Sequence, residues 1–196
     1  MNEKHYKWLM SQGVNVVTLG NHAYHNNQIY TFIDEVNNIV RPINFPKDSP
    51  GKSYVTINYN GIKITVFQAI GNVFMQEGNT SPFLETEELL KNLNSDIIIC
   101  DFHGEATSEK IAFAQHFSGR IDVIFGTHTH VQTNDARILD EGTLYITDIG
   151  MTGPLDGVIG VKKEIIIDRY LTDNQTRFEP QDKGKTQFNG ILIEIN

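Results

Sequence analysis

Residues 96–130 read DIIICDFHGEATSEKIAFAQHFSGRIDVIFGTHTH, and this stretch decides the fold class. The apolar run over residues 96–100 predicts a fully buried strand, because strands that are covered on both faces are hydrophobic throughout. Residues 107–117 predict a helix, and residues 121–125 predict a second buried strand. Strands and helices therefore alternate, which is typical of an α/β protein.

The flanking sequence continues this alternation and adds an antiparallel pair of strands. Asn60-Gly61 separates two β-rich runs and is a strong hairpin signal, because both residues accept a positive φ. We predict a single domain over residues 1–196, of α/β class bordering on α+β, with a mixed sheet. The predicted helices cover residues 3–12, 29–36 (capped by Asn26 or Asn27), 85–94, 107–117 (capped by Thr107 or Ser108) and 162–171, and the predicted strands cover residues 14–19, 53–59, 62–70, 96–100, 121–125, 144–147 and 188–195.

Composition excludes several classes of protein. The 24 acidic and 16 basic residues give a net charge of −8, which argues against a surface that holds nucleic acid through its phosphates. The lone cysteine, Cys100, lies in an apolar run, which predicts a buried thiol in a reducing compartment and rules out an internal disulfide. No stretch approaches the roughly 18 apolar residues of a membrane span. We therefore expect a cytoplasmic protein that is not embedded in a membrane.

Three short polar segments each follow a predicted buried strand directly. They are Gly20-Asn21-His22, Asp101-Phe102-His103, and Gly126-Thr127-His128-Thr129-His130. Sites in open α/β sheets assemble at the carboxyl ends of strands. Neutral imidazoles and an amide oxygen are suitable ligands for Zn, Mn or Fe, so the segments predict a metal site. A metal ion would supply the positive centre that a phosphate substrate needs and the net charge does not provide.

Each of these residues also has a simpler explanation. On an extended segment His128 and His130 would face one side, although two surface histidines near a turn are the alternative. His103 alone is more often a hydrogen-bonded core residue, and Asn21 alone is more often a turn residue, beside which His22 could be structural. Asp101 and Asp148 could orient the ligating histidines, but strand-end capping or turn formation explains them equally well.

With these motifs in place, the chain resembles the YmdB-like family of calcineurin-type metallophosphoesterases, whose members are known as cyclic-nucleotide phosphodiesterases. The resemblance covers nearly the whole chain, and so many matching segments in one order are highly specific. The matching segments are residues 19–22 (LGNH), 40–46 (VRPINFP), 101–110 (DFHGEATSEK), 126–133 (GTHTHVQT) and 146–154 (ITDIGMTGP).

The resemblance implies a calcineurin-like sandwich of mixed sheets flanked by helices, with Asn21, His103, His128 and His130 as metal ligands. It implies that a metal-bridging hydroxide attacks a cyclic phosphodiester, such as a 2′,3′-cyclic nucleotide, while His22 protonates the departing ribose oxygen. Two divalent ions are expected in the complete protein, with Fe or Mn favoured and Zn as a further candidate. The only partner we expect is this small substrate, without a membrane or a stable nucleic-acid complex, and a homo-oligomer is left open.

Two segments of the family pattern do not occur in the 196 residues: a strand that ends in Gly-Asp and a strand that ends in Asn-Gly-Glu-Asn, which carry the acidic ligands. We expect that the sequence is a fragment at both ends, lacks the first strand-helix-strand unit, and is preceded upstream of Met1 by both segments. By the family pattern one ion keeps Asn21, His103 and His128, whereas the other keeps only His130. This exact chain is therefore expected to hold one ion.

Two alternatives to an active phosphodiesterase stay open. The first is a catalytically impaired fragment or a regulatory module that binds a single metal ion, which the missing carboxylates favour. The second is a capsule-synthesis protein of the same superfamily, related to poly-γ-glutamate assembly, because those proteins also carry Asn-His, His-x-x-Glu and His-x-His segments. The long match over residues 101–110 favours the phosphodiesterase.

Overall fold

The computed structural model describes residues 1–75, 79–172 and 174–195. In this part of the chain the helices are α1 (Glu3–Ser11), α2 (Pro82–Asn92), α3 (Thr107–His116) and α4 (Lys163–Thr172), together with the 3₁₀ helix η1 (Asn27–Thr31). The strands are β1 (Val17–Thr18), β2 (Ile39–Val40), β3 (Tyr54–Tyr59), β4 (Ile62–Ile70), β5 (Ile97–His103), β6 (Val123–Thr127), β7 (Arg137–Ile138), β8 (Leu144–Ile146), β9 (Gly153–Pro154) and β10 (Thr186–Gln187). Among these described helices, none combines the length and apolar character that crossing a membrane requires.

The chain divides into two compact units, which we describe separately. Unit 1 comprises Met1–His128 and Asp135–Thr147, and unit 2 comprises Thr129–Asn134 and Asp148–Asn196. The boundary thus falls between the two histidines of the Gly126 to His130 segment. The expectation of one domain over residues 1–196 stays a prediction.

Unit 1 is built on a mixed sheet with the strand order β3-β4-β5-β6-β8-β7. Strands β4, β5, β6 and β8 run parallel, and antiparallel strands β3 and β7 flank them. The hairpin between β3 and β4 turns at Asn60 and Gly61, whose φ values are +52° and +92°, as its sequence predicted. The mixed α/β class is therefore confirmed.

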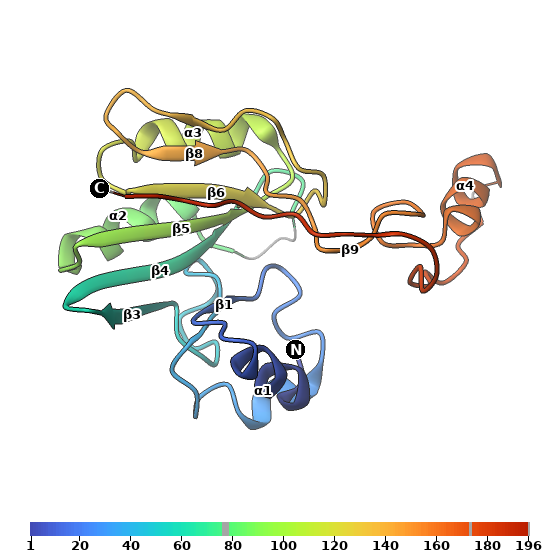
Figure 1. Cartoon of the computed structure of the whole chain (residues 1–196), viewed down its shortest axis with the longest axis horizontal. Coiled ribbons are helices and arrows are strands. Elements are labelled where there is room, and N and C mark those ends of the chain that lie inside the picture. Colours follow the sequence, from blue (N-terminus) through green and yellow to red (C-terminus); the bar gives the residue numbers. More distant parts are fainter. Residues whose placement is uncertain (76–78, 173, 196) are drawn as a thin grey trace. The chain divides into compact units, whose positions relative to one another are not determined.

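Helices α2 and α3 cover one face of this sheet (Figure 1). The rings of Phe67 and Phe102 on the sheet pack with two further phenylalanines, Phe113 of α3 and Phe117 directly after it. All four side chains are fully buried. Cys100 belongs to the same core, and burial raises the pKa of its thiol well above the ordinary value, so the predicted buried thiol is confirmed. This aromatic layer fixes the position of β5, which ends at His103.

Side chains alternate along a strand, so the opposite face of the central strands carries a different set of side chains, which includes two buried polar ones. Gln68 and Asp101, which neighbour the core residues of β4 and β5, are buried there. The segment that follows α1 covers them: Thr18 Oγ1 donates to Asp101 Oδ2 at 2.7 Å, and the Gly20 amide donates to Gln68 Oε1 at 2.7 Å. A buried polar layer therefore lies beneath the Gly20-Asn21-His22 segment.

Unit 2 contains β9 and β10, which form an antiparallel pair, and helix α4. The predicted helix over residues 162–171 is confirmed as α4, but none of its described residues is buried. The predicted strand over residues 188–195 is wrong, because residues 188–195 form no strand pairing. Alternation of apolar and polar residues alone does not supply the partner strand that a ladder requires.

Two further predictions required correction. Residues 29–36 were expected to form an α-helix, but only the 3₁₀ helix η1 forms, with the Asn26 side chain accepting from the Gln28 amide as its N-cap. Helix α3 is preceded by Ala106 at the N-cap without a side-chain cap, so the expected caps Thr107 and Ser108 lie inside the helix. Of these two predicted caps, the cap at Asn26 is therefore confirmed and the cap at Thr107 or Ser108 is wrong.

Candidate metal centre

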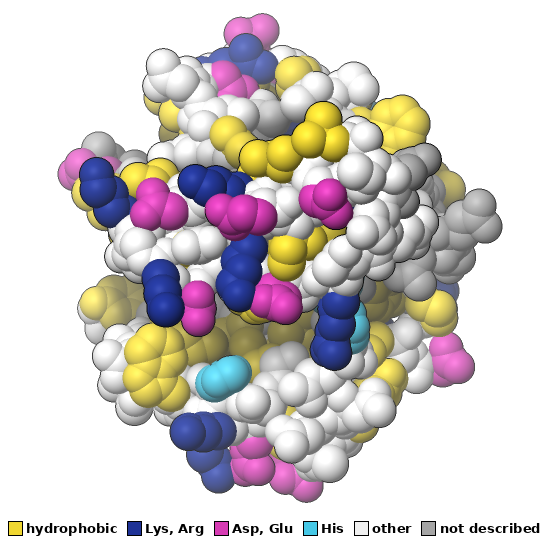
Figure 2. All heavy atoms as spheres, turned by 90° about the vertical axis from the view of Figure 1, so that its right-hand side faces the viewer, with side chains coloured by type: hydrophobic (Ala, Val, Ile, Leu, Met, Phe, Trp, Pro, Cys, Tyr) yellow, Lys and Arg dark blue, Asp and Glu magenta, His cyan; other side chains and the backbone are white. Residues whose placement is uncertain are grey.

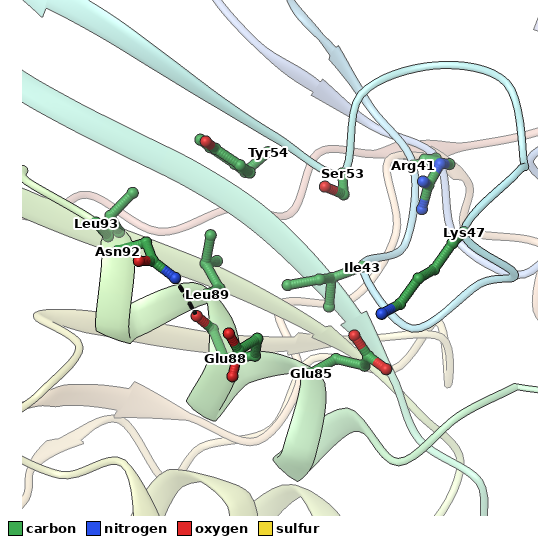
Figure 3. A pocket seen from close by; sticks show the side chains of 10 residues that line it. All are labelled: Arg41, Ile43, Lys47, Ser53, Tyr54, Glu85, Glu88, Leu89, Asn92 and Leu93. Atoms are coloured by element: carbon green, nitrogen blue, oxygen red, sulfur yellow. Dashed lines mark hydrogen bonds between the residues drawn. The ribbon is translucent and has the colours of Figure 1, made fainter.

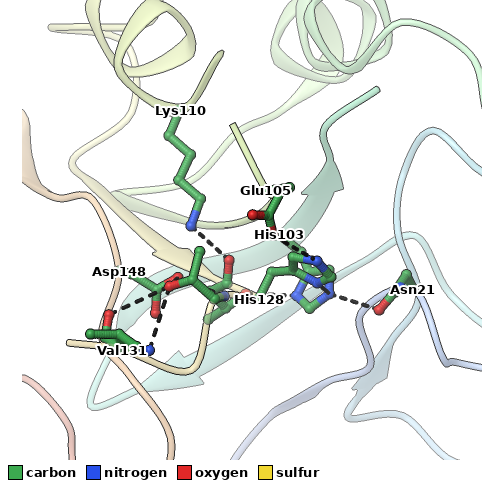
Figure 4. A network of polar contacts seen from close by, with 9 residues as sticks. Asn21, His103, Glu105, Lys110, His128, Val131 and Asp148 are labelled. Carbon is green, nitrogen blue, oxygen red and sulfur yellow. Dashed lines mark hydrogen bonds and ion pairs between the residues drawn. The ribbon is translucent and has the colours of Figure 1, made fainter. Parts of the chain in front are cut away.

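Three polar side chains from two strand ends and one loop converge in unit 1. His103 Nε2 lies 2.9 Å from Asn21 Oδ1 and 3.1 Å from His128 Nδ1. Strands β5 and β6 are parallel neighbours with His103 paired to Thr127, so their carboxyl ends place His103 and His128 side by side. Figure 4 shows the Asn21 side chain directed toward the imidazole of His103. The structure thus brings together three of the four predicted ligands.

These three atoms are suitable for a divalent cation. Ligand atoms that lie about 2.1 Å from an ion at right angles are about 3 Å apart, which is the spacing of Asn21 Oδ1 and His128 Nδ1 from His103 Nε2. Two imidazoles and an amide oxygen suit Fe, Mn or Zn without adding charge. Over residues 1–75, 79–172 and 174–195, no group of three or more His, Cys, Asp or Glu side chains could hold a metal ion. Asn21, His103 and His128 fall outside that definition, because one of the three side chains is an amide.

The ring of His103 is held from behind by a threonine. His103 Nδ1 lies 2.8 Å from Thr127 Oγ1, and this hydroxyl donates to Asp101 Oδ1 at 2.7 Å. Asp101 is 2% exposed. Of the two roles considered for Asp101, the structure therefore supports that of orienting a histidine, through the hydroxyl of Thr127.

The loop that carries Asn21 depends on a glycine. Gly20 has a φ of +69°, and a Cβ atom at this position would lie only 2.8 Å from Cε1 of His103. The absence of a side chain therefore lets the backbone approach the imidazole closely. Sequence alone indicated only a turn at Gly20, but the close approach to His103 makes this glycine part of the site.

His128 occupies an unusual backbone conformation. Its φ is +102°, which is rare for a residue with a side chain. Its Nε2 lies 3.3 Å from Glu105 Oε2, so an Nε2–H group can donate to this carboxylate while Nδ1 faces Nε2 of His103. Such backbone outliers cluster at functional sites, where surrounding contacts maintain them.

His130 belongs to unit 2 and is held by that unit's own contacts. It is exposed, has a φ of +66°, and its Nδ1 lies 3.1 Å from the carbonyl oxygen of Ile159. Since a carbonyl only accepts, the proton lies on Nδ1 and Nε2 carries the lone pair that a metal ligand needs. Asp148 accepts from the amide and hydroxyl of Thr129 and from the Gly150 amide, and these contacts are in keeping with turn formation.

The segment from His128 to His130 is not extended, so the condition under which both histidines would face one side is not met. Strand β6 ends at Thr127, and both histidines have a positive φ, so the side chains do not follow the alternation of a strand. His22 is exposed, follows Asn21 in the same turn, and lies with its ring 5.3 Å from that of His25. A position beside Asn21 is compatible with a proton donor, but the role of His22 stays a prediction.

Several residues that hold the centre were missed from the sequence. Thr127 precedes His128 directly, but a threonine at a strand end carries no distinctive signal. Gln68 donates to Asp101 Oδ2 at 2.5 Å and comes from a strand 33 residues away, so only the fold brings it into place. Glu105 was detectable, because an acidic residue two positions after His103 lies close to the carboxyl end of β5.

One hollow on unit 1 is lined by none of the five predicted site residues. It has a volume of about 320 Å³, and Figure 3 shows the basic side chains of Arg41 and Lys47 sharing it with Glu85 and Glu88. Arg41 donates to the carbonyl oxygens of Pro42, Ser49 and Gly51, which indicates a role in holding its loop. The face drawn in Figure 2 likewise intersperses Lys and Arg with Asp and Glu.

Comparison with known proteins identifies the family. A model of the YmdB-like protein family matches residues 1–196. The chain is 43% identical over 198 residues to the 2′,3′-cyclic-nucleotide 2′-phosphodiesterase of Bacillus subtilis (strain 168), covering 100% of this chain and 74% of that protein. A crystal structure of a hypothetical protein from Thermus thermophilus is 38% identical with a TM-score of 0.90, covering 95% and 73% of the two chains. A crystal structure of a novel phosphatase from Mycoplasma pneumoniae is 35% identical with a TM-score of 0.88, covering 93% and 67%. The chain therefore belongs to the YmdB-like family.

Proposed function

We propose that the chain is a metal-dependent phosphodiesterase that hydrolyses small cyclic phosphodiesters, with 2′,3′-cyclic nucleotides as the leading substrates. The observation that carries the proposal is the convergence of Asn21 Oδ1, His103 Nε2 and His128 Nδ1. The named activity of the Bacillus subtilis relative supports the substrate class. We also propose that the mixed sheet and its helices form a calcineurin-like metallophosphoesterase fold, and that the lone Cys100 reflects a cytoplasmic location.

The chemistry divides between the cation and the side chains around it. When bound, a divalent ion supplies Lewis acidity toward a phosphoryl oxygen and acidifies water, with Fe or Mn favoured here. Asn21, His103 and His128 hold it, and Glu105 fixes the ring of His128. His22 acts as the general acid that protonates the departing ribose oxygen, a role that suits an imidazole near neutral pH.

A second ion forms the finer part of the proposal. His130 contributes one ligand to it, through the Nε2 lone pair that the Ile159 contact leaves available. The Gly-Asp and Asn-Gly-Glu-Asn segments expected to supply acidic ligands do not occur in the 196 residues. Metal analysis of the purified chain would therefore have to establish whether it binds one ion or two.

The test combines metal analysis with hydrolysis of a 2′,3′-cyclic nucleotide and of bis-p-nitrophenyl phosphate. We expect His103→Ala to abolish both metal binding and turnover, and His22→Ala to lower turnover by about 10²- to 10⁴-fold while metal binding persists. The matched control is His5→Ala, because His5 is exposed on α1 and should leave both quantities unchanged. A metal content that is unchanged in His103→Ala would refute the proposed centre.

The alternative with a specific observation in its favour is a regulatory module that binds a single ion. It is favoured by the trio itself, which offers three ligands for one ion. One bound ion per chain without turnover, lost in His103→Ala, would support this module. Membership of the YmdB-like family supports a phosphodiesterase over the capsule-synthesis alternative.

A further inference from the structure

A hollow of about 360 Å³ lies beside His130 in unit 2. Its volume is near the lower end of the range of about 300–1,000 Å³ that small-molecule sites occupy, so it suits a compact ligand. All of its lining residues belong to unit 2, which therefore determines its shape. The lining combines apolar and polar side chains, namely Val131, Met151, Pro154, Leu155 and Ile159 with His130, Gln132, Gln187 and Asn189.

The charge of this lining distinguishes it from other hollows of the molecule. Within the part of the chain that the structure describes, no Lys, Arg, Asp or Glu lines the hollow beside His130. The hollow on unit 1 contains Arg41 and Glu85, and a second hollow of unit 2 contains Lys162, Lys163 and Asp182. A charged group that left water for the hollow beside His130 would find no charged side chain of opposite sign there. This hollow therefore suits an uncharged group.

The apolar part of the lining offers contact to the face of a ring. Leu155 and Ile159 are each 52% exposed, so a ligand that covered them would remove apolar surface from water. Met151 contributes a thioether, which makes favourable contacts with aromatic rings. The Ile159 carbonyl oxygen lies 3.1 Å from Nδ1 of His130, and this contact places the apolar wall next to the histidine.

Three amide side chains supply hydrogen-bonding groups in the same hollow, those of Gln132, Gln187 and Asn189. A Cβ atom at Gly150 would lie 2.7 Å from Asn189 Nδ2 and 2.9 Å from Gln132 Cβ, so this glycine lets both residues pack against the same stretch of backbone. Gln132 Nε2 also donates to the Gly190 carbonyl oxygen at 3.1 Å, which restrains its side chain. Amides both donate and accept, which matches the mixed polar edge of a nucleobase.

We propose that this hollow is a base subsite, which receives the nucleobase of a cyclic nucleotide while the metal centre binds the phosphate. The proposal rests on the proposed function, in which His130 contributes a ligand to an ion that meets the phosphate. A 2′,3′-cyclic nucleotide joins an anionic phosphate to an uncharged base, and only the base suits the uncharged lining. Amides at the edge of a base and apolar side chains against its face are a common way to bind it.

The test compares two substitutions in the base subsite with matched controls elsewhere in unit 2, all in the full chain. Leu155→Ala removes part of the apolar wall, and its control is Leu171→Ala, because Leu171 is 78% exposed on α4. Gln187→Met removes an amide, keeps the side chain similar in size and preserves the backbone pairing with Gly153. Its control is Gln175→Met, because Gln175 is exposed and does not line the hollow.

The first readout is kcat/KM for adenosine 2′,3′-cyclic phosphate and for methyl riboside 2′,3′-cyclic phosphate, which has the same cyclic phosphate but no base. In the wild type we expect a kcat/KM about 10-fold or more higher for the adenosine compound. Leu155→Ala should lower this value about 10-fold, and Gln187→Met should lower it about 3- to 10-fold. The base-free substrate and both control variants should change by less than about twofold.

The second readout is binding of adenosine 3′-monophosphate and of methyl riboside 3-monophosphate in the presence of Mn²⁺, measured by titration calorimetry without turnover. Equal kcat/KM for the two cyclic substrates in the wild type would overturn the base subsite and leave the phosphodiesterase standing, and this comparison needs no variant to fold. If neither substrate is hydrolysed, the proposed function fails. Tighter binding of the adenosine compound, weakened in Leu155→Ala, would then still support the subsite, whereas equal binding of both compounds would overturn it.

Discussion

The two compact units place their candidate ligands by different means. In unit 1, Asn21, His103 and His128 rest on a sheet whose core includes fully buried Phe67, Phe102, Phe113 and Phe117. In unit 2, none of the described hydrophobic side chains falls in the buried class, and His130 is held by hydrogen bonds within its own unit. Packing therefore determines the geometry of the first three ligands, whereas local polar contacts determine that of the fourth.

The largest expected effect tests this contrast in packing. Phe113→Ala in unit 1 should lower the free energy of unfolding by about 3–5 kcal/mol, because it opens a cavity among aromatic rings. Tyr170→Ala in unit 2 is the control, because Tyr170 is 87% exposed and its loss should change stability by less than about 0.5 kcal/mol. Urea denaturation measures both, and a loss at Tyr170 comparable to that at Phe113 would break the comparison.

A smaller effect is expected at the glycine beside His103. Gly20→Ala should cost about 1–3 kcal/mol, because it places a Cβ in a left-handed backbone conformation close to the imidazole, and it should also weaken Mn²⁺ binding. Gly13→Ala provides the matched control, since Gly13 has a φ of +86° and a Cβ atom added there would meet no atom within 4 Å. The Gly13 variant should lose stability alone, measured by denaturation and Mn²⁺ titration. Equal Mn²⁺ affinity in both variants would contradict the close-approach argument.

The smallest effect concerns one surface carboxylate in each unit. Hydrogen bonds from Arg120 and His116 lower the pKa of Glu87 from 4.5 to about 2, and Lys162 lowers the pKa of Glu179 in unit 2. A depressed folded-state pKa stabilises the protein above the unfolded value, and this stabilisation is lost as pH falls from about 4.5 toward 2. Glu87→Gln should therefore flatten the dependence of Tm on pH over this window more than Glu179→Gln does. An equal or reversed order would show that the additional partners of Glu87 do not matter.

The sequence predicted those features of the fold that local patterns determine. The hairpin at Asn60-Gly61, the apolar strands that lead to His103 and His128, and the helix over residues 162–171 follow from turn chemistry and periodicity. The strand predicted over residues 188–195 failed, because strand formation depends on a partner that periodicity does not identify.

The candidate site could be predicted only in part, for a related reason. Strand ends with Asn and His indicate ligands, and Asn21, His103 and His128 do converge. The residues that orient them come from elsewhere in the chain: Thr18 contacts Asp101 across 83 positions, and Gln68 does so across 33. Such contacts depend on tertiary packing and leave no spacing pattern that a reader of the sequence could recognise.

The pairing of His103 with Thr127 across β5 and β6 makes the site sensitive to strand slippage. If β6 slid by one residue, the side chain opposite His103 would come from Gly126 or His128, and Thr127 would turn to the other face of the sheet. The histidine would then lose its hydroxyl partner even though every residue of the site was still present. The orientation of His103 therefore depends on the alignment of these two strands as well as on which residues the site contains.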